Sequence, residues 1–225
     1  MILKADEVAD DVVLITNGAL LTEENSNKLI ETGIKTIRVS LQGISEEDYQ
    51  KTCGYKINFN NFLNNLEYLY KNKSEKTKLY LKIPDIAINT DERKNLFHKL
   101  FDDKCDYLVI QNIGNLFHDL DYSNIIINYP QNKINVCPQL FYLLIIDATG
   151  FVYPCCAMHN DIKVGDINYN NIVEIWGGQL KQLRLKHLQN DKNSIGICKN
   201  CDILNYYYKY DNIDNYADEL LRKYE

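Results

Sequence analysis

Residues 146–156, IDATGFVYPCC, decide how the second half of the chain folds. Thr149-Gly150 is a turn signal between two apolar runs, which extend over 141–147 and 151–153. This arrangement is typical of a β-hairpin. The second strand of the predicted hairpin leads directly into Cys155 and Cys156, so we expect the hairpin to bring cysteine side chains to one end of a small sheet.

Four cysteines have the spacing of ligands to one inorganic centre: Cys137, Cys155, Cys198 and Cys201. The short spacer between Cys198 and Cys201 allows both sulfur atoms to reach the same centre, and the hairpin returns Cys137 and Cys155 to neighbouring strand ends. Four converging thiolates suit tetrahedral zinc or a [4Fe–4S] cluster. Zinc sites usually contain two closely spaced pairs, whereas one pair and two single cysteines favour iron–sulfur. Zinc remains the alternative.

The other cysteines have different interpretations. Cys156 follows Cys155 directly, and adjacent residues of a strand face opposite sides. We therefore expect Cys156 to point elsewhere, where it could pack, face a substrate or replace its neighbour as the ligand. Cys53 and Cys105 stand alone and are interpreted as small buried hydrophobic residues. His159 is a further candidate ligand, interpreted as a loop histidine.

The composition is that of a globular protein of one large or two small domains. Of its 225 residues, 45% are hydrophobic and 25% are charged. The longest apolar run, Leu140 to Ile146, is far shorter than the roughly 20 residues of a membrane span. The net charge of −6 argues against a nucleic-acid binder, which needs a basic excess. An odd number of cysteines without an export signal predicts a cytoplasmic location.

The first half of the chain alternates strand-like and helix-like patterns. Expected strands are 12–15, 35–41, 79–83 and 106–111, with a further candidate at 124–128. Expected helices follow the caps Thr22, Ser45 and Thr90 or span 60–71. This order predicts βαβ units, and hence an α/β fold with a parallel sheet and helices on its outer face. Ligands of such sheets bind at the carboxyl ends of the strands, here near Thr16, Asn17, Gly18, Ser40 and Gln111.

The character of the sequence changes near residue 129, where a polar linker begins. Asn171 and Glu174 predict a capping box at the start of a helix that Gly177-Gly178 breaks or bends. Its expected buried stripe comprises Ile172, Ile175, Trp176, Leu180 and Leu183. Residues 214–224 predict an amphipathic closing helix, and tyrosines 206–208 are interpreted as covering core. The predicted domains are therefore 1–128 and 129–225.

Several motifs occur in a familiar order. Cys137-Pro138, Gly150 and Cys155 form a Cys…Gly…Cys opening, and residues 146–156 match the pattern DG-x-V-x-P-C-C. Further matching segments are Gly165 to Ile167, Ile172 to Trp176, Leu183-Arg184 and Cys198 to Cys201. Together these motifs resemble the C-terminal part of a radical S-adenosylmethionine (SAM) enzyme of the SPASM/Twitch group.

The resemblance implies a small α+β domain with a hairpin, a helix and an auxiliary [4Fe–4S] cluster. Because no cysteine follows Cys201, the similarity is to the shorter Twitch form, which holds one such cluster. The ligands would then be Cys137, Cys155, Cys198 and Cys201. The implied role is to relay an electron or position substrate in the radical oxidation or modification of a peptide or sugar-like substrate.

The first half resembles the radical SAM core, which implies an incomplete TIM-like (βα) barrel over residues 1–128. Leu14 to Gly18 are similar to its TNG turn, and Val39 to Gly43 to its S-x-D-G segment, with Gln42 in place of Asp. The resemblance implies that SAM, in the complete enzyme, lies near Thr16, Asn17, Gly18 and Ser40.

The motif Cys-x-x-x-Cys-x-x-Cys, which holds the SAM-cleaving cluster of the family, is absent from the sequence. We therefore expect a fragment or split part of a full oxidoreductase, which does not cleave SAM alone. An N-terminal half would supply the missing strands, and a flavodoxin or ferredoxin would be the reductant. The alternative is a zinc-stabilised or iron–sulfur binding module without catalysis. Expected partners include a peptide or small-molecule substrate, but neither nucleic acid nor a membrane.

Overall fold

The computed structural model describes residues 2–112, 134–157, 162–199, 201 and 212–224. The chain divides into two compact units, Met1–Ile113 and Gly114–Glu225. The predicted domain boundary at 128/129 and the candidate strand 124–128 lie outside the described residues. His159 and tyrosines 206–208 lie outside them as well.

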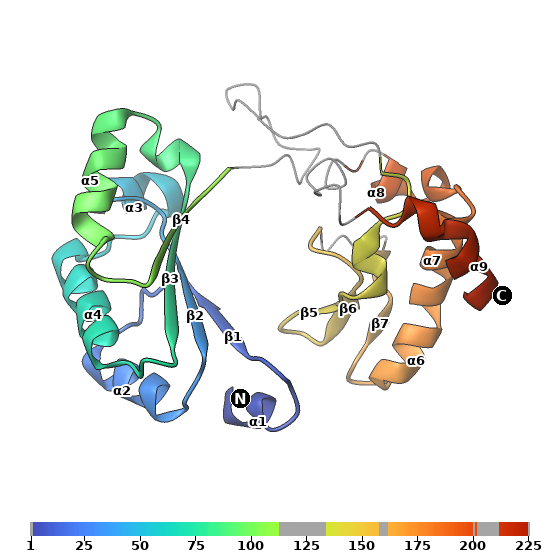
Figure 1. Ribbon diagram of the computed structural model, residues 1–225, viewed down its shortest axis with the longest axis horizontal. Coiled ribbons are helices and arrows are strands. Elements are labelled where there is room, and N and C mark those ends of the chain that lie inside the picture. Colours follow the sequence, from blue (N-terminus) through green and yellow to red (C-terminus); the bar gives the residue numbers. More distant parts are fainter. Residues whose placement is uncertain (1, 113–133, 158–161, 200, 202–211, 225) are drawn as a thin grey trace. The chain divides into compact units, whose positions relative to one another are not determined.

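The first unit is built on four parallel strands in the order β1-β2-β3-β4. The strands are β1 (Val13–Thr16), β2 (Thr36–Ser40), β3 (Lys78–Pro84) and β4 (Tyr107–Gln111). The helices are α1 (Ile2–Asp6), α2 (Glu23–Glu31), α3 (Glu46–Cys53), α4 (Phe59–Asn72) and α5 (Asp91–Phe101), with the 3₁₀ helix η1 (Asp85–Ile88). Figure 1 shows α2, α3, α4 and α5 on one face of the sheet. The expected α/β class and parallel sheet are confirmed.

Alternation along the strands explains why one face of this sheet is covered. Ile37 and Val39 of β2 are buried in the same cluster as Leu79 and Leu81 of β3 and the apolar stripe of α4. The residues between them point to the other face because the side-chain period of a strand is two. There the ring of Tyr80 stacks on that of Tyr107 at 4.5 Å, and the Arg38 guanidinium lies 5.5 Å from the Tyr80 centroid.

This second face is partly exposed, with Ile15 at 64% and Tyr107 at 48%. Parallel sheets of α/β proteins are normally covered on both faces, and in a barrel the inner face is packed with side chains. The exposed inner residues are therefore consistent with the expected incomplete barrel.

The predicted caps fix where the helices begin. The side-chain oxygens of Thr22, Ser45 and Thr90 each accept a hydrogen bond from the backbone N–H three residues later. These bonds satisfy donors that have no partner within the helix. Gly33 follows α2 with a φ of 68°, a left-handed conformation that glycine adopts easily.

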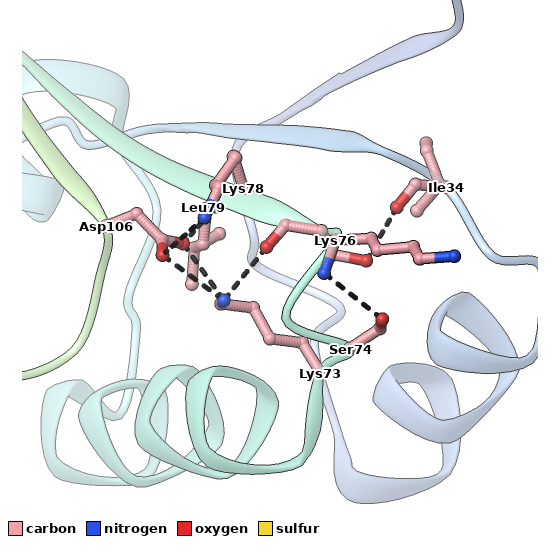
Figure 2. A network of polar contacts seen from close by, with 8 residues as sticks. Ile34, Lys73, Ser74, Lys76, Lys78, Leu79 and Asp106 are labelled. Carbon is pink, nitrogen blue, oxygen red and sulfur yellow. Dashed lines mark hydrogen bonds and ion pairs between the residues drawn. The ribbon is translucent and has the colours of Figure 1, made fainter.

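A polar network joins the strands at the end of the sheet opposite to the candidate ligand-binding edge (Figure 2). Lys73 Nζ lies 3.1 Å from Oδ2 of Asp106 and donates to the Thr77 carbonyl at 2.9 Å. The same Oδ2 accepts from the Leu79 N–H at 2.7 Å. Thr77 Oγ1 in turn donates to the Ile34 carbonyl at 2.7 Å. The network thus connects the end of α4 to the starts of β3 and β4 and to the chain before β2.

The second unit is a small α+β domain. Its strands β5 (Ile145–Ile146), β6 (Phe151–Tyr153) and β7 (Gly165–Asp166) form an antiparallel sheet in that order. Its helices are α6 (Ile172–Gly177), α7 (Gln179–Leu188), α8 (Gly196–Lys199) and α9 (Ala217–Tyr224). Its 3₁₀ helices are η2 (Pro138–Phe141), η4 (Lys192–Ser194) and η7 (Asp214–Tyr216). The hairpin and the break after Gly177 are present as expected, but the first strand of the hairpin is shorter than the predicted 141–147, because it covers only Ile145–Ile146 and Phe141 belongs to η2.

The core of the second unit joins the sheet to α6 and α7. Val152, Val164, Ile175 and Leu180 are buried together. Gly165 lies so close to Ile175 that an added Cβ would approach its Cγ1 to 2.6 Å. The expected capping box is present, since Asn171 Oδ1 accepts from the Glu174 N–H at 2.9 Å.

The expected burial of Ile172 is wrong, because this side chain is 44% exposed. It is the first residue of α6. Within that first turn, Ile175 is the apolar residue that packs against the sheet.

Replacing Asp106 by Asn should lower the free energy of unfolding by about 1–3 kcal/mol at neutral pH, because charge-assisted hydrogen bonds are lost. Burial raises the pKa of the Asp106 carboxyl, but the Leu79 N–H and the Lys73 ammonium outweigh it and hold the pKa below its ordinary value. The stabilisation is therefore full above the unfolded pKa and is lost as the pH falls from about 4 through the folded pKa.

Urea unfolding of both proteins over this pH range is the measurement. The difference between wild type and Asp106→Asn should shrink as the pH falls. Glu75→Gln, which removes an exposed carboxylate, is the matched control and should leave stability unchanged. A difference that stays constant with pH would contradict the ion pair as its cause.

Candidate metal centre

The four predicted ligands line one cavity in the second unit. Cys137, Cys155, Cys198 and Cys201 border about 440 Å³ of space not filled by protein atoms, part of which is open to solvent. The other lining residues are Gln139, Leu140, Pro154, Ile162, Leu183 and His187. Within the described part of the chain, no three Cys, His, Asp or Glu side chains are grouped to hold a metal ion as they stand. The thiols thus share a cavity without being arranged around a single ion.

The hairpin turn positions Cys155. Oδ1 of Asp147 accepts hydrogen bonds from the Thr149 N–H at 2.8 Å and from the Phe151 N–H at 3.0 Å, which closes the turn. Gly150 has a φ of 98°, and an added Cβ would lie 2.3 Å from Nδ2 of Asn168, so this position requires glycine. Strand β6 then runs through the buried Pro154 to Cys155 at the cavity.

Side chains from three later elements hold the segment that carries Cys137. The carboxylate of Asp214, in η7, accepts from the backbone N–H groups of Asn135 at 3.0 Å and Val136 at 2.8 Å. Lys192 Nζ, in η4, donates to the Ile134 carbonyl at 3.2 Å. Nδ1 of His187, in α7, lies 3.3 Å from the Cys137 nitrogen and accepts its N–H. Side-chain hydrogen bonds therefore take the place of a strand or helix at 134–137.

Tight local turns present the remaining two thiols. The Cys198 N–H donates to the Ile195 carbonyl at 3.0 Å, and the Cys201 N–H is 3.4 Å from the Cys198 carbonyl. These bonds between residues three apart wind the chain tightly. As a result both thiols reach the same cavity, as the two-residue spacer predicts.

Burial changes the acid–base properties of the cavity. It raises the pKa of the Cys198 thiol to about 12, with neighbouring cysteines contributing in the same direction. The pKa of the Cys137 thiol is raised for the same reasons. Burial lowers the pKa of His187 to about 4, and Lys192 adds to this lowering. The Asn135 carbonyl opposes it, because it could accept a hydrogen bond from Nδ1 of the protonated ring. At neutral pH these two thiols are therefore protonated and the imidazole is uncharged.

A buried arginine connects the cavity wall to α6. Arg184 is 1% exposed, and its Nε donates to the Leu140 carbonyl at 2.7 Å. Its Nη1 donates to the Trp176 carbonyl at 3.0 Å, and its guanidinium lies 3.9 Å from the centroid of the Trp176 ring. Trp176 packs against the core as expected. The Leu-Arg pair of the sequence motif therefore has a structural role, in which Arg184 fixes η2 next to Cys137.

Cys53, Cys105 and Cys156 are not among the residues that line the cavity. Cys156 is exposed, and its sulfur is 3.8 Å from Nε2 of Gln139, which agrees with the expectation that it points elsewhere. Cys105 is buried as expected. The expected burial of Cys53 is wrong, since this residue is exposed at the end of α3, and its sulfur lies 3.1 Å from the Tyr49 carbonyl.

The predicted cofactor-binding residues of the first unit lie at one edge of the sheet. Thr16 ends β1 and Ser40 ends the neighbouring strand β2. Oγ1 of Thr16 accepts from the Gly18 N–H at 3.1 Å, and Oδ1 of Asn17 accepts from the Ala19 N–H at 3.0 Å, which shapes the turn. Gly18 has a φ of 70° and lies close to Phe62 and Val39. Their proposed contact with SAM stays a prediction.

Three residues of the centre are absent from the sequence-based set: His187, Lys192 and Asp214. The sequence contains a pattern that could have indicated the burial of His187. Leu180, Leu183, Arg184 and His187 recur at helical spacing on one face of α7. No sequence pattern indicates the roles of Lys192 and Asp214, because each contacts backbone more than 50 residues away in the sequence.

Two family models match parts of the chain. A model of an iron–sulfur cluster-binding domain, SPASM, matches residues 137–202. A model of the radical SAM superfamily matches residues 1–99. The resemblance to the radical SAM and SPASM families is thereby confirmed, and the two matches support a radical SAM/SPASM-type iron–sulfur protein. No curated protein sequence matches the chain.

A solved structure of histidine-tagged anSMEcpe "with bound AdoMet" is similar in fold, with a TM-score of 0.54. The sequences are 15% identical, and the similarity covers 94% of this chain and 72% of that one. The partial-barrel fold class is supported by this likeness. None of the described helices is both long and apolar enough to span a membrane.

Replacing Arg184 by Met should lower the free energy of unfolding of the second unit by about 2–4 kcal/mol, because two charge-assisted hydrogen bonds and a stacked cation are lost. Arg184→Lys should recover only part of this loss, since an ammonium group lacks the planar fork. Lys181→Met, which removes a cation from the same helix, is the control. Thermal unfolding is the measurement, and equal losses for Arg184→Met and Lys181→Met would contradict this role.

Proposed function

We propose that the second unit binds an auxiliary [4Fe–4S] cluster, in a domain of the shorter Twitch type. The proposed ligands are Cys137, Cys155, Cys198 and Cys201. The observation that carries the proposal is that four thiols from three separate segments line one cavity. The match to the iron–sulfur cluster-binding family model begins at the first of them and extends just beyond the last. Cysteine thiolates are the usual ligands of such clusters.

The walls of the cavity fit this group. Leu140, Pro154, Ile162 and Leu183 supply apolar surface, which limits the access of water and sets the dielectric around a bound centre. The thiols must lose their protons to act as ligands, so binding releases protons. When bound, a cluster of this kind supplies one-electron transfer.

The wider proposal is that the chain is part of an oxidoreductase that uses SAM. SAM would lie at the carboxyl edge of the first sheet, near Thr16, Asn17, Gly18 and Ser40. The auxiliary cluster would relay an electron or position a peptide or sugar-like substrate during radical oxidation or modification. A flavodoxin or ferredoxin would deliver the electron for SAM cleavage. The match of residues 1–99 to the radical SAM superfamily supports this assignment.

An N-terminal half would complete the sheet at β1. In the described residues this strand pairs with β2 alone, and its Val13 and Ile15 are exposed. Leu14, Leu20 and Leu29 border an apolar groove beside it. An unpaired edge with apolar side chains is a template for pairing with a further strand.

A cytoplasmic location is part of the proposal. Cys53 and Cys156 are exposed and form no disulfide bond, which fits a reducing compartment. Fractionation of cells that express a tagged full chain would test it, and recovery outside the cytoplasmic fraction would contradict it.

Anaerobic reconstitution with iron and sulfide should give about four of each per chain and a brown colour. Replacing Cys137, Cys155, Cys198 or Cys201 by Ser should reduce the iron content and colour. Cys53→Ser and Cys156→Ser are the controls and should keep both. Binding of one zinc without colour would support a zinc-stabilised module instead, and loss of iron in Cys156→Ser but not in Cys155→Ser would reassign that ligand.

The reconstituted chain alone should form no 5′-deoxyadenosine from SAM and a reductant, because its sequence lacks the three-cysteine motif of the SAM-cleaving cluster. Chromatography of the reaction mixture is the measurement, with a complete radical SAM enzyme as positive control. Addition of a segment that contains the motif and pairs with β1 should restore formation. Product formed by the chain alone would refute the proposal that it needs such a partner.

A further inference from the structure

His187 lines the cysteine cavity but is not one of the proposed ligands. It lies in the last turn of α7 and is 2% exposed. A buried polar ring next to four thiols needs an explanation, because burial of a polar group without a partner is unfavourable.

The contacts of Nδ1 indicate which ring nitrogen of His187 carries the hydrogen. Nδ1 lies 3.3 Å from the nitrogen of Cys137 and 3.4 Å from the carbonyl oxygen of Asn135. The backbone N–H of Cys137 can only donate and is directed at Nδ1, so we assign Nδ1 as its acceptor, which puts the hydrogen of the neutral ring on Nε2. The carbonyl of Asn135, at the longer distance, then makes no hydrogen bond to the neutral ring. A protonated ring would carry a hydrogen on Nε2 as well.

This Nε2–H group has no partner among the described residues. Nε2 is buried and makes no hydrogen bond to any of them. Buried polar groups of proteins are paired in the great majority of cases. The cavity that the ring borders is where an acceptor can be placed, and sulfur accepts hydrogen bonds.

We propose that Nε2–H of His187 donates a hydrogen bond to a sulfur atom of the cluster held in this cavity, an inference that rests on the proposed function. His187 then acts as a donor that tunes the cluster, not as a ligand. Hydrogen bonds to the sulfurs stabilise the more negative reduced form and raise the reduction potential. Because Nδ1 holds the backbone of Cys137, the same ring orients one ligand and sets the potential.

The test compares the reconstituted full chain with His187→Leu and His187→Gln. Leu removes the donor, whereas Gln keeps an N–H at a similar position. Iron and sulfide content and circular dichroism establish that each protein is folded and loaded. Anaerobic redox titration should then show that His187→Leu lowers the equilibrium constant for one-electron reduction about tenfold, or about 59 mV. The reduction potential of His187→Gln should be close to that of the wild-type protein.

A second measurement needs only the wild-type protein. Exchange into D₂O should shift its iron–sulfur stretching bands in resonance Raman spectra, and the shift should be absent in any loaded His187→Leu protein. Absence of a shift in wild type, or equal potentials in the three proteins, would overturn the donor role while leaving the cluster in place.

Two other results would also overturn the inference. Loss of one iron in His187→Leu would make His187 a ligand. A wild-type chain that binds no iron and sulfide would show that the proposed function itself fails.

Discussion

The second unit depends on the hydrogen bonds that hold residues 134–137. This segment has neither strand nor helix geometry before η2, yet it is largely buried and carries a thiol of the centre. Backbone groups in such a position need partners, and they are supplied by His187, Lys192 and Asp214. The hairpin brings Cys155 to the cavity, and local turns bring Cys198 and Cys201. The backbone that leads to Cys137 is held instead by hydrogen bonds from side chains distant in the sequence.

The two ends of the first sheet have different roles. At the starts of the strands, the Lys73–Asp106 network binds backbone groups together and contributes to stability. At the carboxyl ends, Thr16 and Ser40 end neighbouring strands. This separation of a stability end from a ligand end is general in barrels of parallel strands. It is also consistent with the residues found at each end of the sheet. The turn after β1 contains small polar residues and glycine, whereas the other end of the sheet contains the Lys73–Asp106 ion pair.

Sequence reasoning succeeded where structure depends on near neighbours. The caps at Thr22 and Asn171 and the turn at Gly150 each act within three or four residues, so their patterns are visible in the sequence. The four cysteines were found because their chemistry is rare. The exposure of Cys53 and Ile172 was missed, since it depends on what packs against each helix. Asp214 was missed because its partners are distant in the sequence and its residue type is common.

The position of Asp214 has a consequence for biosynthesis. Its contact with Val136 spans 78 residues. The ribosome must therefore synthesise the chain as far as Asp214 before the hydrogen bonds that hold the Cys137 segment can form. Of the four thiols, the first to be synthesised is thus among the last to be fixed. Iron and sulfide would accordingly be inserted only after Asp214 has left the ribosome. A nascent chain stalled before that residue would have an incompletely formed binding site.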